Sequence, residues 1–468
     1  MSRRARVAAI VSVGVFVASL DLFIVNIAFP DLQRDFGGAS LASLSWILNA
    51  YAIVFAALLV PAGRWADRLG RKRAFLGGLA TFTLASALCA AAPSVGALVA
   101  ARVLQAAGAA VLMPASLGLL LPEFPPAKRG LALGLWAAVG GTAAAAGPLI
   151  GGLLVELSWR WVFVVNLPVG VAAVVAGARV LREVHDADSP RPDVPGAIVL
   201  AGAVGTLIAA IVQGPGWGGG DARVAGLFAA AAVLAVTFGV RTVRHHAPVV
   251  EPDLLRVRAF AAANGAGLLF FVGFAAMLLG SVLFLTEVRG DSVLRAGLEI
   301  APGPATAALF AVPGGVLGQR IGPRAVGALG ALLFSAGGIW WAAHAGGSSH
   351  YVSDFLPGMI IGGAGVGLVN PALASAATAQ LPAARLATGS AILTMSRQLG
   401  SALGVALFVA VLGTPSPAEL SGAFRDVWTL MYVSGLGAFL AFLAVGPVRA
   451  GAPAAIPAAA AGAAEAAA

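Results

Sequence analysis

Residues 44–73 read LSWILNAYAIVFAALLVPAGRWADRLGRKR, an apolar run that ends in a dense cluster of charges. The run from 44 to 63 carries no charge, and roughly 20 mainly apolar residues are enough to cross a bilayer as a helix. A second uncharged run, 74–92, follows the charged cluster at once. The stretch therefore predicts two neighbouring membrane-spanning helices that are joined by a short charged turn.

The same pattern continues along the 468 residues, of which 59% are apolar and only 10% are charged. A soluble domain carries roughly 25% charged residues, so this composition excludes an ordinary water-soluble enzyme. The two-residue alternation of a membrane β-barrel is absent, which predicts an all-α polytopic membrane protein. We count fourteen apolar runs, at 8–30, 44–63, 74–92, 95–121, 130–155, 161–181, 195–213, 223–241, 260–286, 296–318, 324–343, 353–379, 386–412 and 428–447.

The distribution of Lys and Arg predicts the orientation of these spans. If the amino terminus is cytoplasmic, 21 of the 29 Lys and Arg residues fall in cytoplasmic segments and six fall outside. This asymmetry is what the positive-inside rule expects, and it predicts a multi-pass protein of the cell membrane with both termini in the cytoplasm. It also accounts for the net charge of +9 without any nucleic-acid partner.

Two segments of the chain are repeated at nearly one offset. The sequence GVLGQRIGPR from Gly315 matches GRWADRLGRKR from Gly63, and IIGGAGVGLVNPAL matches VLQAAGAAVLMPAS, where Gly108 and Pro114 meet Gly365 and Pro371. Duplicated halves around a central cavity are common in transporters. We therefore predict an N-terminal six-helix half at 1–182, a linker with two inserted spans at 183–258, a C-terminal six-helix half at 259–449 and a disordered Ala-rich tail at 450–468.

Three ionisable residues fall well inside the spans: Asp21, Arg102 and Arg397. Such residues are costly in hydrocarbon and are functional candidates by default. Asp21 lies eight residues before Phe29, near the end of its run, and Arg102 lies seven residues after the start of its own. Both are therefore roughly 11–12 Å below the same membrane surface, which favours a charge pair, either static or functional. Arg397 either binds an anionic substrate group or donates to carbonyls at helix ends.

Other residues are candidates for a substrate cavity or a metal site. With Arg397, the possible cavity residues are Asn26, Trp46, Asn49, Tyr51 and Trp136, although packing or lipid contact is the alternative for each aromatic side chain. The single cysteine, Cys89, lies in an apolar run and excludes a disulfide framework. The five histidines are not spaced as metal ligands, so we expect neither a metal nor a cofactor.

Several motifs resemble those of the major facilitator superfamily and, within it, of the fourteen-span drug:proton antiporter family. GRWADRLGRKR is similar to the signature loop of the superfamily, and LDLFIVNIAFPDL in the first span resembles the first-helix motif of the fourteen-span family. RVLQAAGAA resembles the Arg-containing motif that is linked to proton coupling, and GGTAAAAGPLIGG resembles the antiporter motif. WRWVFVVNLPVG from Trp159 is also typical of the fourteen-span members.

The resemblance implies a major facilitator fold and a role for each motif. Asp21 and Arg102 are the expected proton-coupling residues. The expected gating residues are Gly63, Asp67, Arg68, Gly70 and Arg71, whose charges also anchor the topology. Small residues allow close helix packing in lipid, and a proline favours a kink, so the antiporter motif predicts a bent and smooth helix around Gly147, Pro148, Gly151 and Gly152.

The predicted function is therefore a proton-coupled antiporter that exports small amphipathic compounds, such as drugs or antibiotics, by alternating access. We expect it to work as a monomer, with a small-molecule substrate, protons and membrane lipid as its partners. The chain has no GxxxxGK[ST] loop, which argues against an ATP-driven pump. An uncoupled facilitator and an exporter of an endogenous metabolite stay open as alternatives. A polytopic membrane enzyme fits less well, because no constellation of acidic or His residues marks a membrane face.

Overall fold

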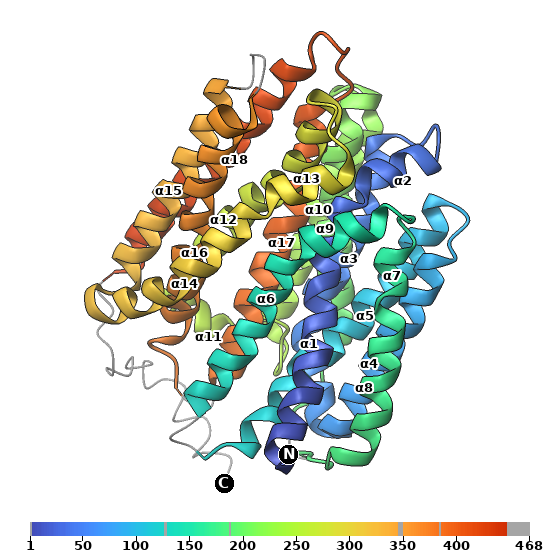
Figure 1. The fold of residues 1–468 in the computed structure, drawn as a ribbon. Helices are drawn as coiled ribbons and strands as arrows, with labels where there is room; N and C mark the ends of the chain where they lie inside the picture. Colours follow the sequence, from blue (N-terminus) through green and yellow to red (C-terminus); the bar gives the residue numbers. More distant parts are fainter. Residues whose placement is uncertain (1, 126–128, 187–188, 345–349, 383–384, 447–468) are drawn as a thin grey trace.

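The computed structural model describes residues 2–125, 129–186, 189–344, 350–382 and 385–446, and within these ranges all regular elements are helices. Fourteen of the helical segments are long and apolar enough to cross a membrane, as the sequence predicts. Figure 1 shows them as one tilted bundle, with α4, α5 and α8 on one side and α15, α16 and α18 on the other. The predicted tail at 450–468 lies outside the described residues.

The N-terminal helices, α1 to α8, form six of these spans. Two short helices, α2 and α7, interrupt the chain between longer ones, and a 3₁₀ turn follows α5. The bounds are α1 (Arg3–Ile27), α2 (Phe29–Asp35), α3 (Leu41–Leu69), α4 (Arg71–Ala90), α5 (Val95–Leu120), η1 (Leu121–Glu123), α6 (Arg129–Val155), α7 (Trp161–Val164) and α8 (Asn166–Val180).

The remaining helices comprise the two additional spans and the C-terminal helices, α12 to α18. Two of the latter spans include a turn of π-helix, η3 and η4. The bounds are α9 (Val194–Trp217), α10 (Ala222–Arg244), α11 (Pro252–Leu255), α12 (Arg258–Leu283), η3 (Phe284–Val288), α13 (Val293–Ile300), α14 (Pro302–Ile321), α15 (Pro323–His344), η4 (Tyr351–Phe355), α16 (Leu356–Thr378), α17 (Leu386–Leu412) and α18 (Leu420–Ala444).

The ends of the helices follow from local sequence chemistry. The side chains of Ser40, Ser94 and Asp193 each accept a hydrogen bond from a backbone N–H in the first turn of α3, α5 and α9. Such N-caps satisfy donors that have no partner within the helix. At the other end of α3 and α14, Gly70 and Gly322 adopt φ values of +110° and +88°, which only glycine reaches without strain. Each of these spans therefore stops abruptly, and the next helix starts within one or two residues.

The same close contacts recur in the N-terminal and C-terminal helices. A methyl group added at Gly78 of α4 would lie 2.8 Å from the carbonyl oxygen of Gly108 on α5. At Gly330 of α15 it would lie 2.9 Å from the carbonyl oxygen of Gly365 on α16. Gly108 and Gly365 are equivalent in the sequence repeat, so the repeated glycines serve the same backbone-to-backbone approach.

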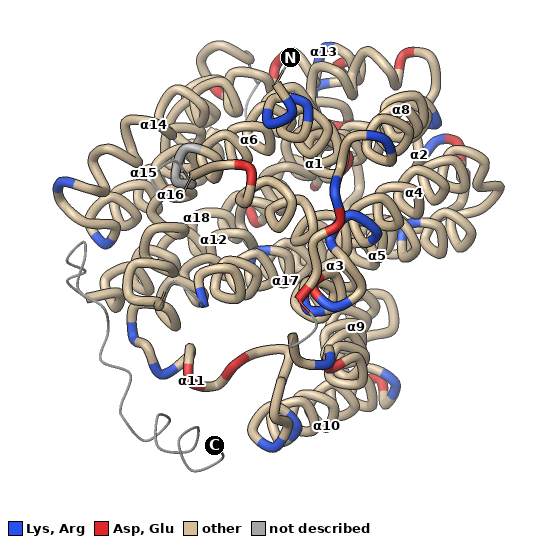
Figure 2. The backbone as a smooth tube through the Cα atoms, turned by 90° about the horizontal axis from the view of Figure 1, so that it is seen from below, with Lys and Arg blue, Asp and Glu red and all other residues tan. Residues whose placement is uncertain are grey.

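The two additional spans lie at the side of the bundle. Helix α9 packs on both α3 and α17, whereas α10 packs mainly on α9 and has only two buried residues, Val224 and Ala231. Figure 2 shows α10 at the periphery, in a view from the end of the bundle where α1 begins. We call the end of the bundle where α1 begins the N-terminal end. Helix α9 therefore covers the seam where an N-terminal helix and a C-terminal helix meet.

The charge asymmetry and the two additional spans predict the accessibility of two exposed positions. His185 precedes α9, and Gly219 lies between α9 and α10, where an added side chain would meet nothing within 4 Å. In a Cys89→Ser background, we expect an impermeant maleimide to label Gly219→Cys in intact cells and His185→Cys only in everted vesicles. Labelling of both cysteines from the same side would contradict the predicted crossing by α9, and the reversed pattern would contradict the orientation.

Candidate functional site

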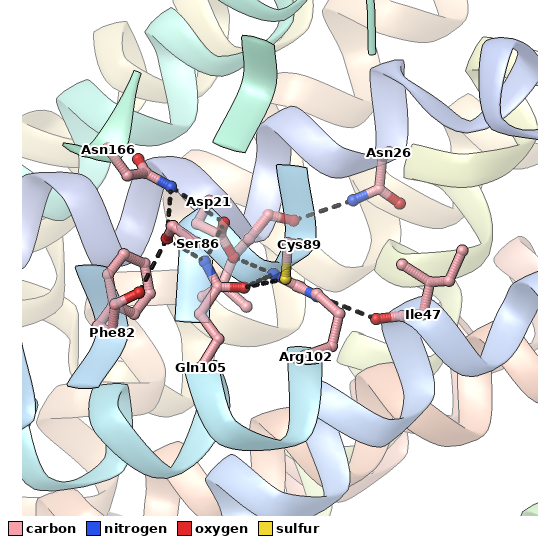
Figure 3. A network of polar contacts seen from close by, with 10 residues as sticks. Asp21, Asn26, Ile47, Phe82, Ser86, Cys89, Arg102, Gln105 and Asn166 are labelled. Carbon is pink, nitrogen blue, oxygen red and sulfur yellow. Dashed lines mark hydrogen bonds and ion pairs between the residues drawn. The ribbon is translucent and has the colours of Figure 1, made fainter. Parts of the chain in front are cut away.

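A buried ion pair joins α1 and α5 among the N-terminal helices. Asp21 of α1 and Arg102 of α5 are fully buried. The Nη1 atom of Arg102 donates to the Oδ2 atom of Asp21, and Figure 3 shows the two side chains pointing toward one another. The structure thus brings together the two residues that the sequence puts at equal depth. Removal of a charge from water costs several kcal/mol per ion, so such a pair needs further hydrogen bonds.

Amide and hydroxyl side chains supply these hydrogen bonds. The Nε2 atom of Gln105 donates to Asp21 Oδ1 (2.9 Å) and to Ser86 Oγ (2.8 Å), while its Oε1 atom accepts from Arg102 Nη1 (2.6 Å). Asn166 Nδ2 lies 3.4 Å from Asp21 Oδ1 and 3.3 Å from Ser86 Oγ. We call these five residues the Asp21 network. It connects α1, α4, α5 and α8, so both carboxylate oxygens have partners.

A further shell holds the guanidinium of Arg102 in place. Its Nε atom donates to the carbonyl oxygen of Ile47 on α3 (3.1 Å). Its Cζ atom lies 4.1 Å from the ring centre of Tyr51 and 5.9 Å from that of Phe163, which are cation–π distances. Tyr51, a predicted cavity residue, is therefore a buried neighbour of Arg102. The thiol of Cys89 is buried beside Gln105, in keeping with a core residue.

Two hydrogen bonds join the end of α2 to the segment that precedes α7 and Asn166. The Oδ2 atom of Asp35 accepts hydrogen bonds from Trp159 Nε1 (2.7 Å) and Arg160 Nη1 (3.0 Å). These two hydrogen bonds hold the pKa of Asp35 below its ordinary value. The WRWVFVVNLPVG motif thus begins with an anchor at the end opposite the N-terminal end, and Asn166 follows as the first residue of α8.

Three members of the Asp21 network were not among the residues predicted from the sequence: Ser86, Gln105 and Asn166. Gln105 follows Arg102 by three residues, which puts it on the same face of a helix. Asn166 is one of few polar residues in its span. The signal was therefore a set of uncharged polar residues inside spans, but their convergence on one carboxylate depends on how four helices pack.

The other predicted cavity residues lie in different surroundings. Asn26 donates from Nδ2 to a carbonyl one turn earlier on α1 (2.9 Å), and Trp136 donates to a hydroxyl on α5 (2.9 Å). Trp46 is half-buried against the apolar core. Asn49 is fully buried, and among the described residues neither atom of its amide has a hydrogen-bond partner. Arg397 lies on α17, outside the Asp21 network.

The predicted signature loop is mostly helical. Helix α3 extends to Leu69, Gly70 makes the turn, and α4 begins at Arg71. The Oδ1 atom of Asp67 accepts from Arg71 Nε (2.8 Å), and Arg71 Nη1 donates to the carbonyl oxygen of Gly118 on α5 (3.0 Å). The carboxylate of Asp67 is therefore engaged within the N-terminal helices, and its side chain is 36% exposed.

The linker that precedes α9 binds to this same 63–73 segment. The carboxylate of Glu183 accepts from the backbone N–H groups of Lys72 (2.9 Å) and Arg73 (3.2 Å), so it caps the start of α4. The side chain of Arg68 donates to the carbonyl oxygen of Ser189 (2.8 Å). The charges of the segment thus have partners in a linker that is more than a hundred residues away in the sequence.

The linker that follows α10 also binds the 63–73 segment. The Nη1 atom of Arg64 donates to the carbonyl oxygens of Ala247 (2.7 Å) and Pro248 (2.9 Å). The carboxylate of Glu251 lies 3.4 Å from Arg64 Nη2 and 3.7 Å from Arg385 Nη1, at the start of α17. Glu251 therefore lies between a cation of α3 and a cation of α17. Figure 2 shows charged residues gathered around this end of α3.

The antiporter motif puts the smooth face of α6 against α1. A methyl group at Gly147 would lie 2.7 Å from Phe23 Cβ, and one at Gly151 would lie 3.1 Å from Ile24 Cγ1. No side chain larger than hydrogen fits at Gly147 without a shift of α1 or α6. The two helices can therefore approach closely next to Asp21, which lies two residues before Phe23.

The same helix contacts the C-terminal helices through α13. A methyl group at Gly152 would lie 3.2 Å from the Cα atom of Leu294, and one at Gly297 would lie 2.6 Å from the carbonyl oxygen of Pro148. Pro148 lies inside α6. These contacts lie toward the end opposite the N-terminal end, so α6 connects the surroundings of Asp21 to the C-terminal helices.

Among the described residues, no three His, Cys, Asp or Glu side chains are grouped as a metal site would require. The arrangement instead holds one buried carboxylate against one cation. Gln105, Ser86 and Asn166 carry groups that can both donate and accept hydrogen bonds, and they supply the remaining partners of the pair.

Comparison with known proteins identifies the family of this chain. The profile of the Major Facilitator Superfamily matches residues 11–405. The chain is 34% identical to the tetracenomycin C resistance and export protein of Streptomyces glaucescens, over 89% of this chain and 77% of that protein. It is 32% identical to a methylenomycin A resistance protein of Streptomyces coelicolor (91% and 90% covered) and 33% identical to the multidrug resistance protein Stp of Mycobacterium tuberculosis (85% and 74% covered).

Solved structures show the same fold at low sequence identity. A peptide transporter POT in complex with sulfate matches with a TM-score of 0.69 at 17% identity, over 95% of this chain and 96% of that chain. A bacterial homologue of the human lysosomal transporter Spinster, in an inward-facing conformation, matches with a TM-score of 0.67 at 17% identity, over 95% and 98%. The chain therefore belongs to the Major Facilitator Superfamily, a family of transporters rather than enzymes, and is related to antibiotic and drug resistance exporters.

Proposed function

We propose that this protein is a proton-coupled antiporter that exports small amphipathic compounds across the cell membrane by alternating access. Its relatives are named for resistance to, or export of, tetracenomycin C, methylenomycin A and other drugs, which supports a small-molecule substrate. In this proposal both termini are cytoplasmic, lipid surrounds the spans, and a monomer is the working unit. Residues 1–182 and 259–449 act as the two moving halves.

The observation that carries the proposal is the full burial of the Asp21 carboxylate against a single cation, Arg102. A buried carboxylate responds to two opposed effects, because burial favours its neutral form and a neighbouring cation favours its charged form. Any movement that changes either effect changes how tightly the group holds a proton. Each tenfold change in proton affinity corresponds to about 1.4 kcal/mol of free energy, which an exchange cycle can use.

Protonation of Asp21 would remove the charge that compensates Arg102. An unpaired guanidinium in this position costs several kcal/mol, so it would seek other acceptors. Helices α1 and α5 are both tied to this pair, and α6 lies on α1 through Gly147 and Gly151. A rearrangement of the pair would therefore be transmitted to α6 and to its contacts with α13.

The 63–73 segment is the proposed gate at the N-terminal end. In this arrangement Asp67 is bound to Arg71, both on the N-terminal helices, and it is partly exposed. Gly63 faces Pro114 of α5, Gly70 makes the turn beside Glu183, and Arg68 binds the linker at Ser189. A carboxylate near the start of a C-terminal helix would interact favourably with the helix dipole, so closure of this end would give Asp67 a second partner.

The first test neutralises the proton-carrying group. We expect Asp21→Asn to lower export driven by a pH gradient by at least about tenfold, or about 1.4 kcal/mol, because the amide mimics a permanently protonated carboxyl. Export of ethidium, Hoechst 33342 and 1-pyrenebutyrate would be followed by fluorescence in everted vesicles at equal protein abundance. Asp253→Asn, which removes an exposed carboxylate in a linker, is the matched control. Undiminished, gradient-dependent export by Asp21→Asn would refute the assignment. The next carboxylates to test would then be Glu156, which follows the end of α6, and Glu287 in η3, both near ends of spans.

A second test measures the coupling inside the pair. Arg102→Gln leaves a buried carboxylate without its cation, so we expect it to cost about 3–5 kcal/mol of stability. The double variant Asp21→Asn, Arg102→Gln carries no buried charge and should regain much of that loss. Thermal unfolding of the purified proteins in detergent compares the stability of the two single variants and the double variant with that of the wild type. Additive losses, with a double variant less stable than either single one, would show that the two residues do not stabilise one another.

A third test addresses the gate. We expect Asp67→Asn to reduce the transport rate several-fold while abundance and melting temperature change little, because a partly exposed ion pair contributes about 1 kcal/mol or less. Arg73→Gln, which removes an exposed charge from the same segment, is the control. Wild-type transport by Asp67→Asn at equal abundance would leave the segment with the role of a topology anchor only.

A further inference from the structure

The C-terminal helices contain a cation that lacks the compensation given to Arg102. Arg397 lies eleven residues into α17, which is about 16 Å from the start of the helix and near its middle. Among the described residues its side chain forms no ion pair and no hydrogen bond, and it lies instead over an aromatic ring. The Cζ atom lies 4.4 Å from the ring centre of Phe271 on α12. A cation at this depth is costly unless it finds a partner of opposite charge.

No acidic side chain of the described C-terminal helices shares this depth. Glu287, Asp291, Glu299, Asp354 and Glu419 all belong to the end of the bundle opposite the N-terminal end, and the exposed Asp426 lies only six residues into α18 from that same end. Several of them are already paired there, since Asp291 and Glu299 both bind Arg295. The protein therefore supplies one positive charge at the middle of α17 and no negative charge beside it.

The surroundings of Arg397 combine polar and aromatic groups on one face of α12. Asn264, Gly267 and Phe271 follow one another at intervals of three and four residues, so they line the same stripe of that helix. A methyl group at Gly267 would lie 3.8 Å from Arg397 Cγ, which shows that the stripe faces Arg397. The hydroxyl of Ser396 donates to Asn264 Oδ1 (2.9 Å). A guanidinium, an amide and a hydroxyl therefore lie beside an aromatic surface.

The aromatic surface extends along α12. The ring of Phe271 contacts those of Phe270 and Phe274, with centres 5.6 and 5.3 Å apart. Phe271 is itself buried (6% exposed), whereas Phe274 is partly exposed, so a flat apolar ligand would bury its surface against Phe274 while a group of opposite charge would reach the guanidinium. A guanidinium presents parallel N–H donors that match the two oxygens of a carboxylate.

We propose that Arg397 is the recognition site for the carboxylate of the transported compound, and that the aromatic or apolar body of this compound packs on the exposed part of the α12 aromatic surface, at Phe274. The inference rests on the proposed export function, and it narrows the substrate class to amphipathic organic anions. Bound in this way, substrate and Arg397 together are neutral, so the loaded C-terminal helices carry no net charge at this depth. Asn264 and Ser396 act as positioning residues that border the site.

Direct binding to the purified full-length protein in detergent tests the inference without a proton gradient. The probes are four aromatic carboxylates of increasing size and their neutral amides: benzoate, 2-naphthoate, anthracene-9-carboxylate and 1-pyrenebutyrate. Isothermal titration calorimetry should show that the wild type binds at least one carboxylate at least about tenfold more tightly than its amide, or about 1.4 kcal/mol. A wild type that prefers none of the carboxylates would overturn the inference.

Substitutions of Arg397 then test whether this side chain causes the tighter binding of carboxylates over amides. Arg397→Gln keeps hydrogen-bonding capacity and loses the charge, so it should bind each carboxylate no better than its amide. Arg397→Lys keeps the charge and should retain part of the preference, and the exposed Arg256→Gln is the matched control. Circular dichroism and melting temperature verify that each variant is folded. An Arg397→Gln protein that still prefers the carboxylate would show that the anion binds elsewhere.

The outcome separates this inference from the proposed function. If everted vesicles export no probe but the carboxylate preference depends on Arg397, the export proposal fails and the anion site stands. If export follows the pH gradient and Arg397→Gln changes neither binding nor transport of 1-pyrenebutyrate, the anion site fails alone.

Discussion

The compensation of one buried charge governs the architecture of the N-terminal helices. Asp21 and Arg102 can lie in the interior only because amides and hydroxyls from α4, α5 and α8 complete their hydrogen bonds. Each of these helices must therefore present its polar residue at one level. The close glycine contacts between α4 and α5 and between α1 and α6 bring the backbones near enough for short side chains to meet. Close helix packing is thus what allows short polar side chains to compensate the buried ion pair.

The C-terminal helices use the same scaffold for a different charge distribution. Gly330 and Gly365 repeat the contact of Gly78 and Gly108, so the helix pairs are built alike. At the centre, however, Arg102 has a carboxylate, a carbonyl and an amide as partners, whereas Arg397 lies on an aromatic ring. A duplicated framework can therefore hold a compensated ion pair among one set of helices and a cation against an aromatic ring among the other.

The sequence predicted the features that depend on periodicity and depth, because both are local properties. The fourteen spans are confirmed, and the equal depth of Asp21 and Arg102 correctly indicated their contact. The composition of the network around them could not be derived, because Ser86 and Asn166 reach Asp21 only through the packing of separate helices. The roles of these residues, and the boundaries of the two halves, stay predictions.

The linkers before α9 and after α10 do more than connect the two additional spans, because both bind the N-terminal helices. Glu183 caps α4, and the carbonyl oxygens of Ala247 and Pro248 accept hydrogen bonds from Arg64. Both ends of the insertion therefore bind the same 63–73 segment. Excision of residues 183–258 would leave the first turn of α4 uncapped and a partly buried guanidinium without acceptors. Loss of a helix cap costs about 1 kcal/mol, so a chain without the insertion would be more stable with other residues at positions 64 and 70–73. The insertion and the 63–73 segment therefore depend on one another.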